Sequence, residues 1–319
     1  MMRPLVILTG PTAVGKTALS IKLAKEINGQ IISADSVQVF KGMDIGSAKI
    51  SEEEKEGIKH YLIDVLDPDE TFDVSVFKDM ATMAVNEIYH SGHIPILVGG
   101  TGFYIHALLY DADFDDASHD ESIRKELTEY YEQKGTDALF DLLRECDPKS
   151  CLSIHKNNTA RVIRAIEYFK TTGKPISYHN EEEHRKDSPY NFAYFVLNDD
   201  RSLLYERIDR RIDKMLEDGL IEEVKELLAK GYSLENGSMK ALGYKEIISF
   251  LNGEADLETA VYILKRDTRH FAKRQLTWFK REDQVIWLDR SLYSEDQIFD
   301  IMLKELESKE IIKNDQRYL

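Results

Sequence analysis

Cysteine is scarce in this 319-residue sequence, and long apolar runs are absent. The two cysteines, Cys146 and Cys151, are spaced neither as a disulfide framework nor as a paired metal motif, which favours a reducing cytoplasm. No run reaches the roughly 18 apolar residues of a membrane span, and the N-terminus lacks the basic start and cleavage site of a signal peptide. Secreted disulfide-rich proteins and membrane-spanning proteins are therefore excluded as expected classes.

Positive charge is also in short supply. Lys and Arg number 42 against 58 Asp and Glu, giving a formal net charge of −16. Nucleic-acid-binding proteins usually carry a basic surface. The negative net charge argues against a basic surface over the whole protein, but it is compatible with a local basic patch. The nine histidines show no metal-ligand spacing. The composition, 42% hydrophobic and 31% charged, is that of a globular protein with one large domain or two moderate ones.

Strand-like and helix-like segments alternate over the first 114 residues. The apolar runs at residues 5–8, 31–33 and 94–98 are each followed by polar or glycine-rich segments, at residues 10–17, 35–36 and 99–102. Such alternation predicts an α/β fold with a parallel sheet. Ligands of these sheets bind at the carboxyl ends of the strands, so we expect the three segments to converge on one pocket.

The segment Gly10-Pro11-Thr12-Ala13-Val14-Gly15-Lys16-Thr17 has the form of a phosphate-binding loop, G-x-x-x-x-G-K-T, between a strand and a helix. Its glycines allow consecutive backbone N–H groups to surround an anion at the positive end of the helix. Lys16 adds a full charge, and the Thr17 hydroxyl is a candidate Mg²⁺ ligand. The loop alone does not distinguish a nucleotide from a diphosphate ester or another polyphosphate.

Asp35 follows the second predicted strand, close to the phosphate loop. A carboxylate there is able to bind magnesium or to accept a proton from an attacking group. It is equally consistent with a solvated turn aspartate or a helix N-cap. Both interpretations stay open from the residues alone.

Residues 115–190 are predicted to form a helical insertion between core segments 1–114 and 191–319. An acidic stretch marks its start, with Asp111, Asp113, Asp115, Asp116, Asp120 and Glu121. Helical periodicity then runs to about residue 168, with breaks at Gly135 and Asp147-Pro148. A strand at 192–197 resumes the core pattern, and helices are expected at about 203–217, 221–229, 240–251 and 257–281, with one more after 289.

Basic residues are concentrated in two helices of the C-terminal core segment. Arg207 and Arg211 share one helix face, where they form either a diphosphate clamp or an exposed face balanced by acids. Residues 265–281 contain seven Lys or Arg against one acid, and Arg266, Arg269, Lys273 and Lys280 form a stripe. This concentration predicts a nearby phosphate backbone. Trp278 is placed either to stack on bases or to pack in the core.

Several separate motifs together resemble one known family, the tRNA dimethylallyltransferases, also called tRNA isopentenyltransferases. The likeness extends over nearly the whole chain, and its most specific parts surround Asp35 and Lys273–Trp278. The motifs are Gly10–Thr17, Ser33–Gly46, Gly99–Gly102, Arg161–Glu167, Thr172–Pro175, Gly219-Leu220 with Glu223-Val224, Ala241–Glu246, and Ala272–Gln275 with Thr277–Phe279.

The resemblance implies a P-loop NTPase-like core and one reaction. A dimethylallyl group would move from dimethylallyl diphosphate to the N6 amine of the adenosine 3′ to a tRNA anticodon, at position 37, leaving pyrophosphate in the phosphate loop. Lys16, Mg²⁺ on Thr17, and Arg211 would neutralise the leaving group, with Arg207 also at the diphosphate. Asp35 would accept the amine proton.

The resemblance also implies the tRNA contacts. Ser36, Val37, Gln38 and Thr101 would line the adenosine pocket beside Asp35. Arg124, Arg161 and Arg164 of the insertion would contact the anticodon arm. The remaining contacts would come from Lys240, Gly243, Tyr244, Lys245, Lys273, Arg274, Gln275 and Trp278. The expected enzyme is a cytoplasmic monomer with no membrane partner.

The alternative is an ATP-dependent P-loop kinase of a small molecule or nucleoside. The basic stripe has no evident purpose in such a kinase. A nucleotide-binding interaction protein without catalysis is a third possibility, against which Asp35 counts.

Overall fold

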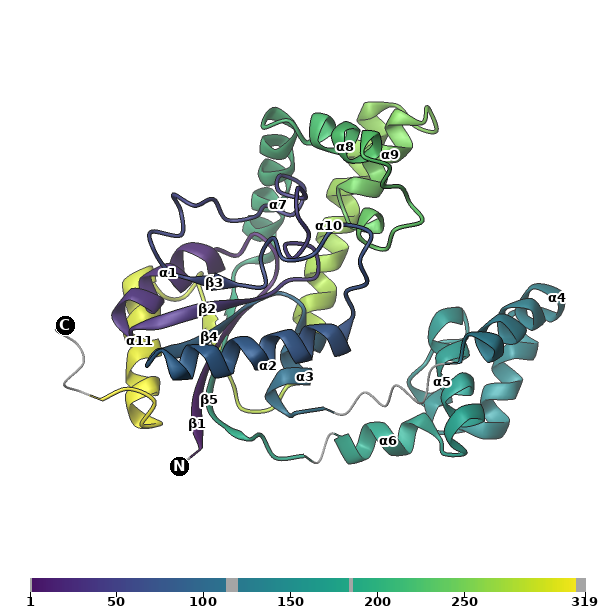
Figure 1. The fold of residues 1–319 in the computed structure, drawn as a ribbon, viewed down its shortest axis with the longest axis horizontal. Helices are drawn as coiled ribbons and strands as arrows, with labels where there is room; N and C mark the ends of the chain where they lie inside the picture. Colours follow the sequence, from purple (N-terminus) through teal and green to yellow (C-terminus); the bar gives the residue numbers. More distant parts are fainter. Residues whose placement is uncertain (1, 113–119, 184–185, 314–319) are drawn as a thin grey trace. The chain divides into compact units, whose positions relative to one another are not determined.

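The computed structural model describes residues 2–112, 120–183 and 186–313 and divides the chain into two compact units (Figure 1). One unit comprises Met1–Leu109 with Pro189–Leu319, and the other comprises Tyr110–Ser188. Part of the acidic boundary stretch, namely Asp113, Asp115 and Asp116, lies outside the described residues. No helix in the described part of the chain is long and apolar enough to cross a membrane.

A six-stranded parallel sheet forms the centre of the first unit, in the order β3-β2-β4-β1-β5-β6. The strands are β1 (Arg3–Thr9), β2 (Gly29–Ala34), β3 (His60–Tyr61), β4 (Ile94–Gly99), β5 (Tyr190–Asn198) and β6 (Val285–Asp289). The predicted α/β class with a parallel sheet is confirmed. The edge strands β3 and β6 were not predicted, because each is short and mostly exposed or half-buried.

The strands of this sheet are apolar on both faces. Leu5, Val6, Ile7 and Leu8 of β1 are all fully buried. Val6 and Leu8 join one core cluster with residues of α1 (Lys16–Glu26) and α11 (Glu295–Ser308). A parallel strand covered by helices on both faces has no solvent side, which explains the uninterrupted apolar run.

Helices of the first unit differ from the prediction mainly at their boundaries. A helix at Gly102–Leu109, α3, was not predicted, and the expected helix from residue 240 begins at Tyr244 after a 3₁₀ turn at Ser238–Lys240. The remaining helices are α2 (Val74–His90), α7 (Arg201–Glu217), α8 (Leu220–Ala229), α9 (Tyr244–Leu251) and α10 (Leu257–Phe279). Figure 1 shows α7 to α10 gathered as one helical group, and their mutual contacts agree.

The second unit is helical over its described residues. It contains α4 (Glu121–Cys146), α5 (Thr159–Thr172) and α6 (Ile176–Glu183), with a 3₁₀ turn at Ser150–Leu152. Gly135 interrupts α4 with φ 81° and ψ 179°, and α5 ends at Gly173 in the left-handed region. The predicted break at Gly135 is confirmed, whereas α6 was not predicted.

Asp147 joins three segments of this second unit. Its side chain is buried and accepts hydrogen bonds from the backbone N–H and hydroxyl of Ser150 and of Ser177, at 2.6–3.1 Å. Burial alone would raise the pKa of Asp147, but the hydrogen bonds from Ser177 and Ser150 outweigh it and lower the pKa. The ionised carboxylate therefore ties the end of α4 to the start of α6.

We predict that Asp147→Ala destabilises the second unit by about 2–3 kcal/mol, because buried donors lose their acceptor. Hydrogen exchange of the buried amides of α5 measures the effect. Asp141→Ala, which removes an exposed ion pair with Arg144, is the control and should change protection little. The folded-state pKa of Asp147 is depressed, so its contribution is present above the ordinary pKa and is lost as the pH falls through the folded value. Unchanged α5 exchange in Asp147→Ala would contradict this role.

Candidate active site

The phosphate loop joins β1 to α1 and has the backbone that its glycines predict. Gly10 has φ 145°, and a Cβ there would lie 2.5 Å from the Leu197 carbonyl oxygen. Gly15 has φ 97° and precedes α1 without any side-chain cap. The first-turn N–H groups of α1 therefore keep their capacity for an anion.

Lys16 is folded back onto its own loop. Its Nζ donates to the carbonyl oxygens of Gly10 and Pro11, each at 2.9 Å. The pKa of Lys16 is lowered to about 7, chiefly by burial and then by the positive charge of Arg211, while Asp35 opposes the shift. Arg211 and Asp35 are therefore both close enough to influence the charge of Lys16.

Asp35 has the hydrogen bonds of a turn aspartate and also lines the cavity. Its Oδ1 accepts from the backbone N–H of Val37 at 2.8 Å and of Gln38 at 3.3 Å, as in a turn aspartate. Within the described residues no donor bonds its second oxygen, Oδ2, and the residue lines the same cavity as Lys16. One oxygen is used for the turn, which leaves the other for chemistry.

The predicted arginine pair separates into two environments. Arg211 is nearly buried, which lowers its pKa, and its Nη1 lies 3.4 Å from the Thr12 hydroxyl. Arg207 forms an ion pair with the buried Asp199 at 2.7 Å. Both line the cavity, but only Arg211 brings a charge that no described acid neutralises by direct pairing.

A cavity of about 360 Å³ lies at the carboxyl ends of the central strands. The predicted site residues that line it are Thr12, Ala13, Gly15, Lys16, Thr17, Asp35, Gln38, Arg207, Arg211 and Gln275. Ser36, Val37 and Thr101 do not line it. Five further lining residues were not predicted, namely Ser33, Ser47, Ala48, Val98 and Phe271. Ser47 directly follows the resemblance motif that ends at Gly46, whereas Phe271 carried no distinguishing signal.

Gln275 connects α10 to two loops of the site. Its Oε1 accepts from the Thr12 backbone N–H at 2.9 Å, and its Nε2 donates to the Gly100 carbonyl at 2.9 Å. A Cβ on Gly100 would lie 2.1 Å from that Nε2, so the loop and the side chain are in close contact. Gln275, which was predicted as a tRNA contact, has a buried bridging position, and its contact with tRNA stays a prediction.

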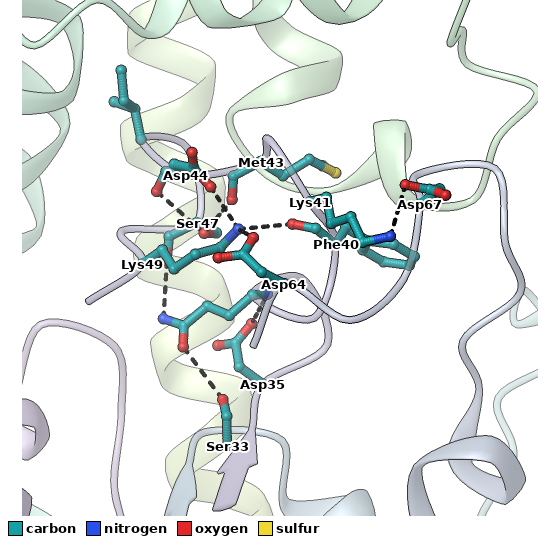
Figure 2. Close-up of polar contacts among 12 residues, drawn as sticks. Ser33, Asp35, Phe40, Lys41, Met43, Asp44, Ser47, Lys49, Asp64 and Asp67 are labelled. Carbon is teal, nitrogen blue, oxygen red and sulfur yellow. Dashed lines mark hydrogen bonds and ion pairs between the residues drawn. The ribbon is translucent and has the colours of Figure 1, made fainter. Parts of the chain in front are cut away.

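Residues 36–49 form a wall of the cavity, in which Gln38, Ser47 and Ala48 are the lining residues. Lys49 and Gln38 hold this segment together, and Figure 2 shows Lys49 with its partners Phe40, Asp44 and Asp64. The buried Lys49 ammonium donates to the Phe40 carbonyl at 2.8 Å and pairs with Asp44 and Asp64. Gln38 Nε2 donates to the carbonyls of Ser47 and Ala48, and Gln38 Oε1 accepts from Ser33. The side-chain amide of Gln38 therefore connects β2 to residues 47 and 48, and Gln38 also lines the cavity.

The basic stripe on α10 is only partly available. Lys265, Arg266 and Arg269 are ion-paired with Asp213, Asp267 and Asp209 respectively. Lys273, Arg274, Lys280 and Arg281 are exposed, and no acid in the described part of the chain pairs with them. The unneutralised positive charge therefore lies in the C-terminal half of the stripe.

Two predicted tRNA contacts, Tyr244 and Trp278, make side-chain contacts within the first unit. The Tyr244 side chain is fully buried and donates to Glu223 at 2.8 Å, and Gly243 beside it is also buried, whereas Lys240 and Lys245 are exposed. Trp278 donates through Nε1 to Glu282 at 2.9 Å and packs on Gly102 and Phe103. Tyr244 is therefore enclosed by the protein, whereas Trp278 is half-buried, and a tRNA contact of either residue stays a prediction.

The arginines of the second unit share a buried acid. Arg124 and Arg164 approach Glu167, which is fully buried, at 2.9 and 3.5 Å. Arg161 is exposed at the start of α5. Of the three predicted anticodon-arm contacts, two thus also balance an internal charge.

Magnesium fits this site only together with a phosphate ligand. The described residues contain no group of three or more His, Cys, Asp and Glu able to hold a metal. Thr17 is exposed at the cavity, and Asp35 keeps one carboxylate oxygen beside it. Mg²⁺ commonly takes one or two protein oxygens and completes its shell with phosphates and water, which suits this small donor set.

We predict that Gln275→Ala weakens binding of inorganic pyrophosphate about tenfold, because Thr12 N–H and the Gly100 carbonyl lose their shared partner. Isothermal titration calorimetry measures the affinity. Thr277→Ala, an exposed neutral change on the same helix, should bind as the parent does. Parent-like affinity in Gln275→Ala would show that the bridge does not shape the loop.

Comparison with known proteins accounts for this combination of loop, carboxylate and α10. The IPP transferase family model matches residues 38–282. A tRNA dimethylallyltransferase of Lachnoclostridium phytofermentans is 60% identical over 98% of this chain and all of its own length, so the likeness also includes the phosphate loop and Asp35.

Solved structures give the same result. The full-length tRNA isopentenylpyrophosphate transferase of Bacillus halodurans is 44% identical, with a TM-score of 0.73 over 97% of this chain and 98% of that one. A eukaryotic dimethylallyltransferase acting on tRNA is 30% identical, with a TM-score of 0.82 over 97% of this chain and 79% of that one. The chain belongs to the IPP transferase family, that of the tRNA dimethylallyltransferases.

Proposed function

We propose that this chain transfers a dimethylallyl group from dimethylallyl diphosphate to N6 of the adenosine at position 37 of tRNA and releases pyrophosphate. The observation that carries the proposal is the placement of Asp35 and the phosphate loop on one cavity. Asp35, whose Oδ2 has no donor among the described residues, lines the same cavity as the phosphate loop. This arrangement suits a proton acceptor opposite a diphosphate leaving group.

The diphosphate is held by the loop Gly10–Thr17. Its backbone N–H groups surround the phosphate, while Lys16 exchanges its bonds to Gly10 and Pro11 for bonds to phosphate oxygens. Arg211, whose Nη1 lies 3.4 Å from the Thr12 hydroxyl, contributes a second charge, and Arg207 a third that Asp199 partly balances. Mg²⁺, held by Thr17 and the diphosphate, would supply further neutralisation of the leaving group.

The nucleophile is the exocyclic amine of adenosine. As its nitrogen forms a bond to the first carbon of the dimethylallyl group, the carbon–oxygen bond to the diphosphate breaks and the electron pair leaves with pyrophosphate. The proton lost by the amine passes to Oδ2 of Asp35. Because this amine is a weak nucleophile, alignment must supply much of the acceleration, and good alignment is worth about 7–11 kcal/mol.

The tRNA approaches with its phosphate backbone along the exposed end of α10. Lys273 and Arg274 lie there, on the helix whose Gln275 reaches the phosphate loop. Ser36, Val37, Gln38 and Thr101 lie around the entry to the adenosine pocket, Lys240 and Lys245 extend the contact, and Arg161 with Arg124 and Arg164 contacts the anticodon arm. All these residues come from one chain, so the proposal requires no second copy.

Radiolabelled dimethylallyl diphosphate tests the activity directly. We expect label to enter an unmodified tRNA transcript with adenosine at position 37 and not the same transcript with guanosine there. ATP hydrolysis or phosphoryl transfer to a small molecule, without labelled tRNA, would identify a kinase instead.

Asp35→Asn is predicted to slow transfer at least about 100-fold while pyrophosphate and tRNA affinities change less than about threefold. Asparagine keeps an oxygen for the Val37 and Gln38 N–H groups but does not accept the amine proton. Single-turnover kinetics and filter binding measure the two effects. Equal losses in rate and tRNA affinity would reduce Asp35 to a binding contact, and Asp35→Ala shows what loss of the turn adds.

Lys273→Ala should weaken tRNA binding and reduce the slope of log affinity against log salt by about one unit. Lys304→Ala on α11 is the matched control, because Lys304 is also exposed and has no acidic partner in the described ranges. Affinities measured from 50 to 300 mM salt, roughly the range in which phosphate contacts are screened, separate the variants. A parent-like slope in Lys273→Ala would remove this end of α10 from the interface.

A further inference from the structure

A single carboxylate from α8 binds three consecutive backbone N–H groups of the cavity wall. Glu223 Oε2 accepts from Asp44 at 2.9 Å and from Ile45 at 2.6 Å, and its Oε1 accepts from Gly46 at 3.1 Å. Consecutive N–H groups arranged in this way form a nest, in which an anion is the natural occupant. Here the protein provides that anion itself, from a helix almost 180 residues away in sequence.

Tyr244 completes the arrangement. Its hydroxyl donates to Glu223 Oε1 at 2.8 Å, and a Cβ on Gly46 would lie 2.6 Å from its ring. The ring is fully buried against the turn that Glu223 holds. Burial, together with the charge of Glu223, raises the pKa of Tyr244, so the hydroxyl stays protonated and remains a donor.

The restrained turn leads directly to the reacting groups. Ser47 and Ala48, the next two residues, line the cavity, and their carbonyls accept from Gln38 Nε2 at 3.3 Å. The backbone N–H of Gln38 in turn donates to Oδ1 of Asp35. Hydrogen bonds, together with the backbone of residues 46–48 and Gln38, therefore connect Glu223 to the carboxylate of Asp35. Figure 2 shows the end of this connection at Asp35.

We propose that Glu223 is a positioning residue for the transfer reaction, which fixes the wall at residues 44–48 and through it the orientation of Asp35. This inference rests on the proposed function. Glu223 does not line the cavity and touches no reacting atom. Loss of the Glu223 carboxylate should therefore lower the rate of transfer within the enzyme–substrate complex and leave the phosphate loop intact.

Glu223→Gln is the test variant, because the amide keeps the length of the side chain but places a donor against the N–H groups. We expect kcat for transfer to fall about tenfold to a hundredfold, as a displacement near 1 Å does, with pyrophosphate affinity within about twofold of the parent. Tyr244→Phe removes one of four bonds and should show a smaller loss of kcat. Hydrogen exchange at Asp44, Ile45 and Gly46 should accelerate in Glu223→Gln.

Glu222→Gln on the same helix is the control, since Glu222 is exposed and pairs only with Lys225 among the described residues. It should match the parent in every measurement. Full kcat in Glu223→Gln, with an active parent, overturns the positioning role and leaves the proposed function standing. A parent that transfers no label overturns the proposed function and this inference with it. Equal losses of kcat and pyrophosphate affinity show a general disturbance and also overturn the local role.

Discussion

The double hydrogen bond of Gln275 is the constraint that joins the chemistry of this protein to its surface. One amide group fixes both the Thr12 N–H of the phosphate loop and the Gly100 carbonyl at the end of β4. Both partners are backbone groups, so the contact defines loop shape independently of the side chains around it. The same helix carries the exposed Lys273 and Arg274, two residues and one residue before Gln275 in the chain. One helix, α10, therefore connects that exposed surface to the anion site.

The distribution of charge explains how an acidic protein accommodates two anionic substrates. A net charge of −16 would repel RNA if it were spread evenly. Along α10, however, acids neutralise the N-terminal half of the basic stripe and leave the C-terminal half positive. Inside the cavity, burial and then the positive charge of Arg211 lower the pKa of Lys16. An anion bound beside Lys16 and Arg211 offsets the effect of these positive charges on each other's surroundings, so the folded site favours an anionic ligand.

Local sequence patterns identified the parts of the site that a few neighbouring residues create. The phosphate loop and the carboxylate after β2 were predictable because turn geometry, the helix N-terminus and strand ends are short-range features. The α/β class followed from the same alternation. The short edge strand β6 was not predicted, because only one of its residues, Leu288, is buried.

Long-range contacts account for what the sequence did not reveal. Gln275 and Tyr244 lie in segments that had been assigned to the RNA surface, yet their partners lie 263 and 21 residues away and draw both side chains inward. A polar residue on a helix has the same local signature whether it faces solvent or a distant backbone group. Lys49 and Glu223 illustrate the point, since each lies in a polar run whose partners only the folded chain brings together.

The order of strands also has a consequence for how this architecture is able to diversify. β1 lies between β4 and β5, so the central three strands include the two that flank the helical unit in sequence. β4 pairs with β1 and β2, and β5 pairs with β1 and β6, so the ladder of each flanking strand is made with strands of the first unit. The six-stranded sheet is consequently built within the first unit, so a change in the length or sequence of the helical unit would leave every strand pairing in place.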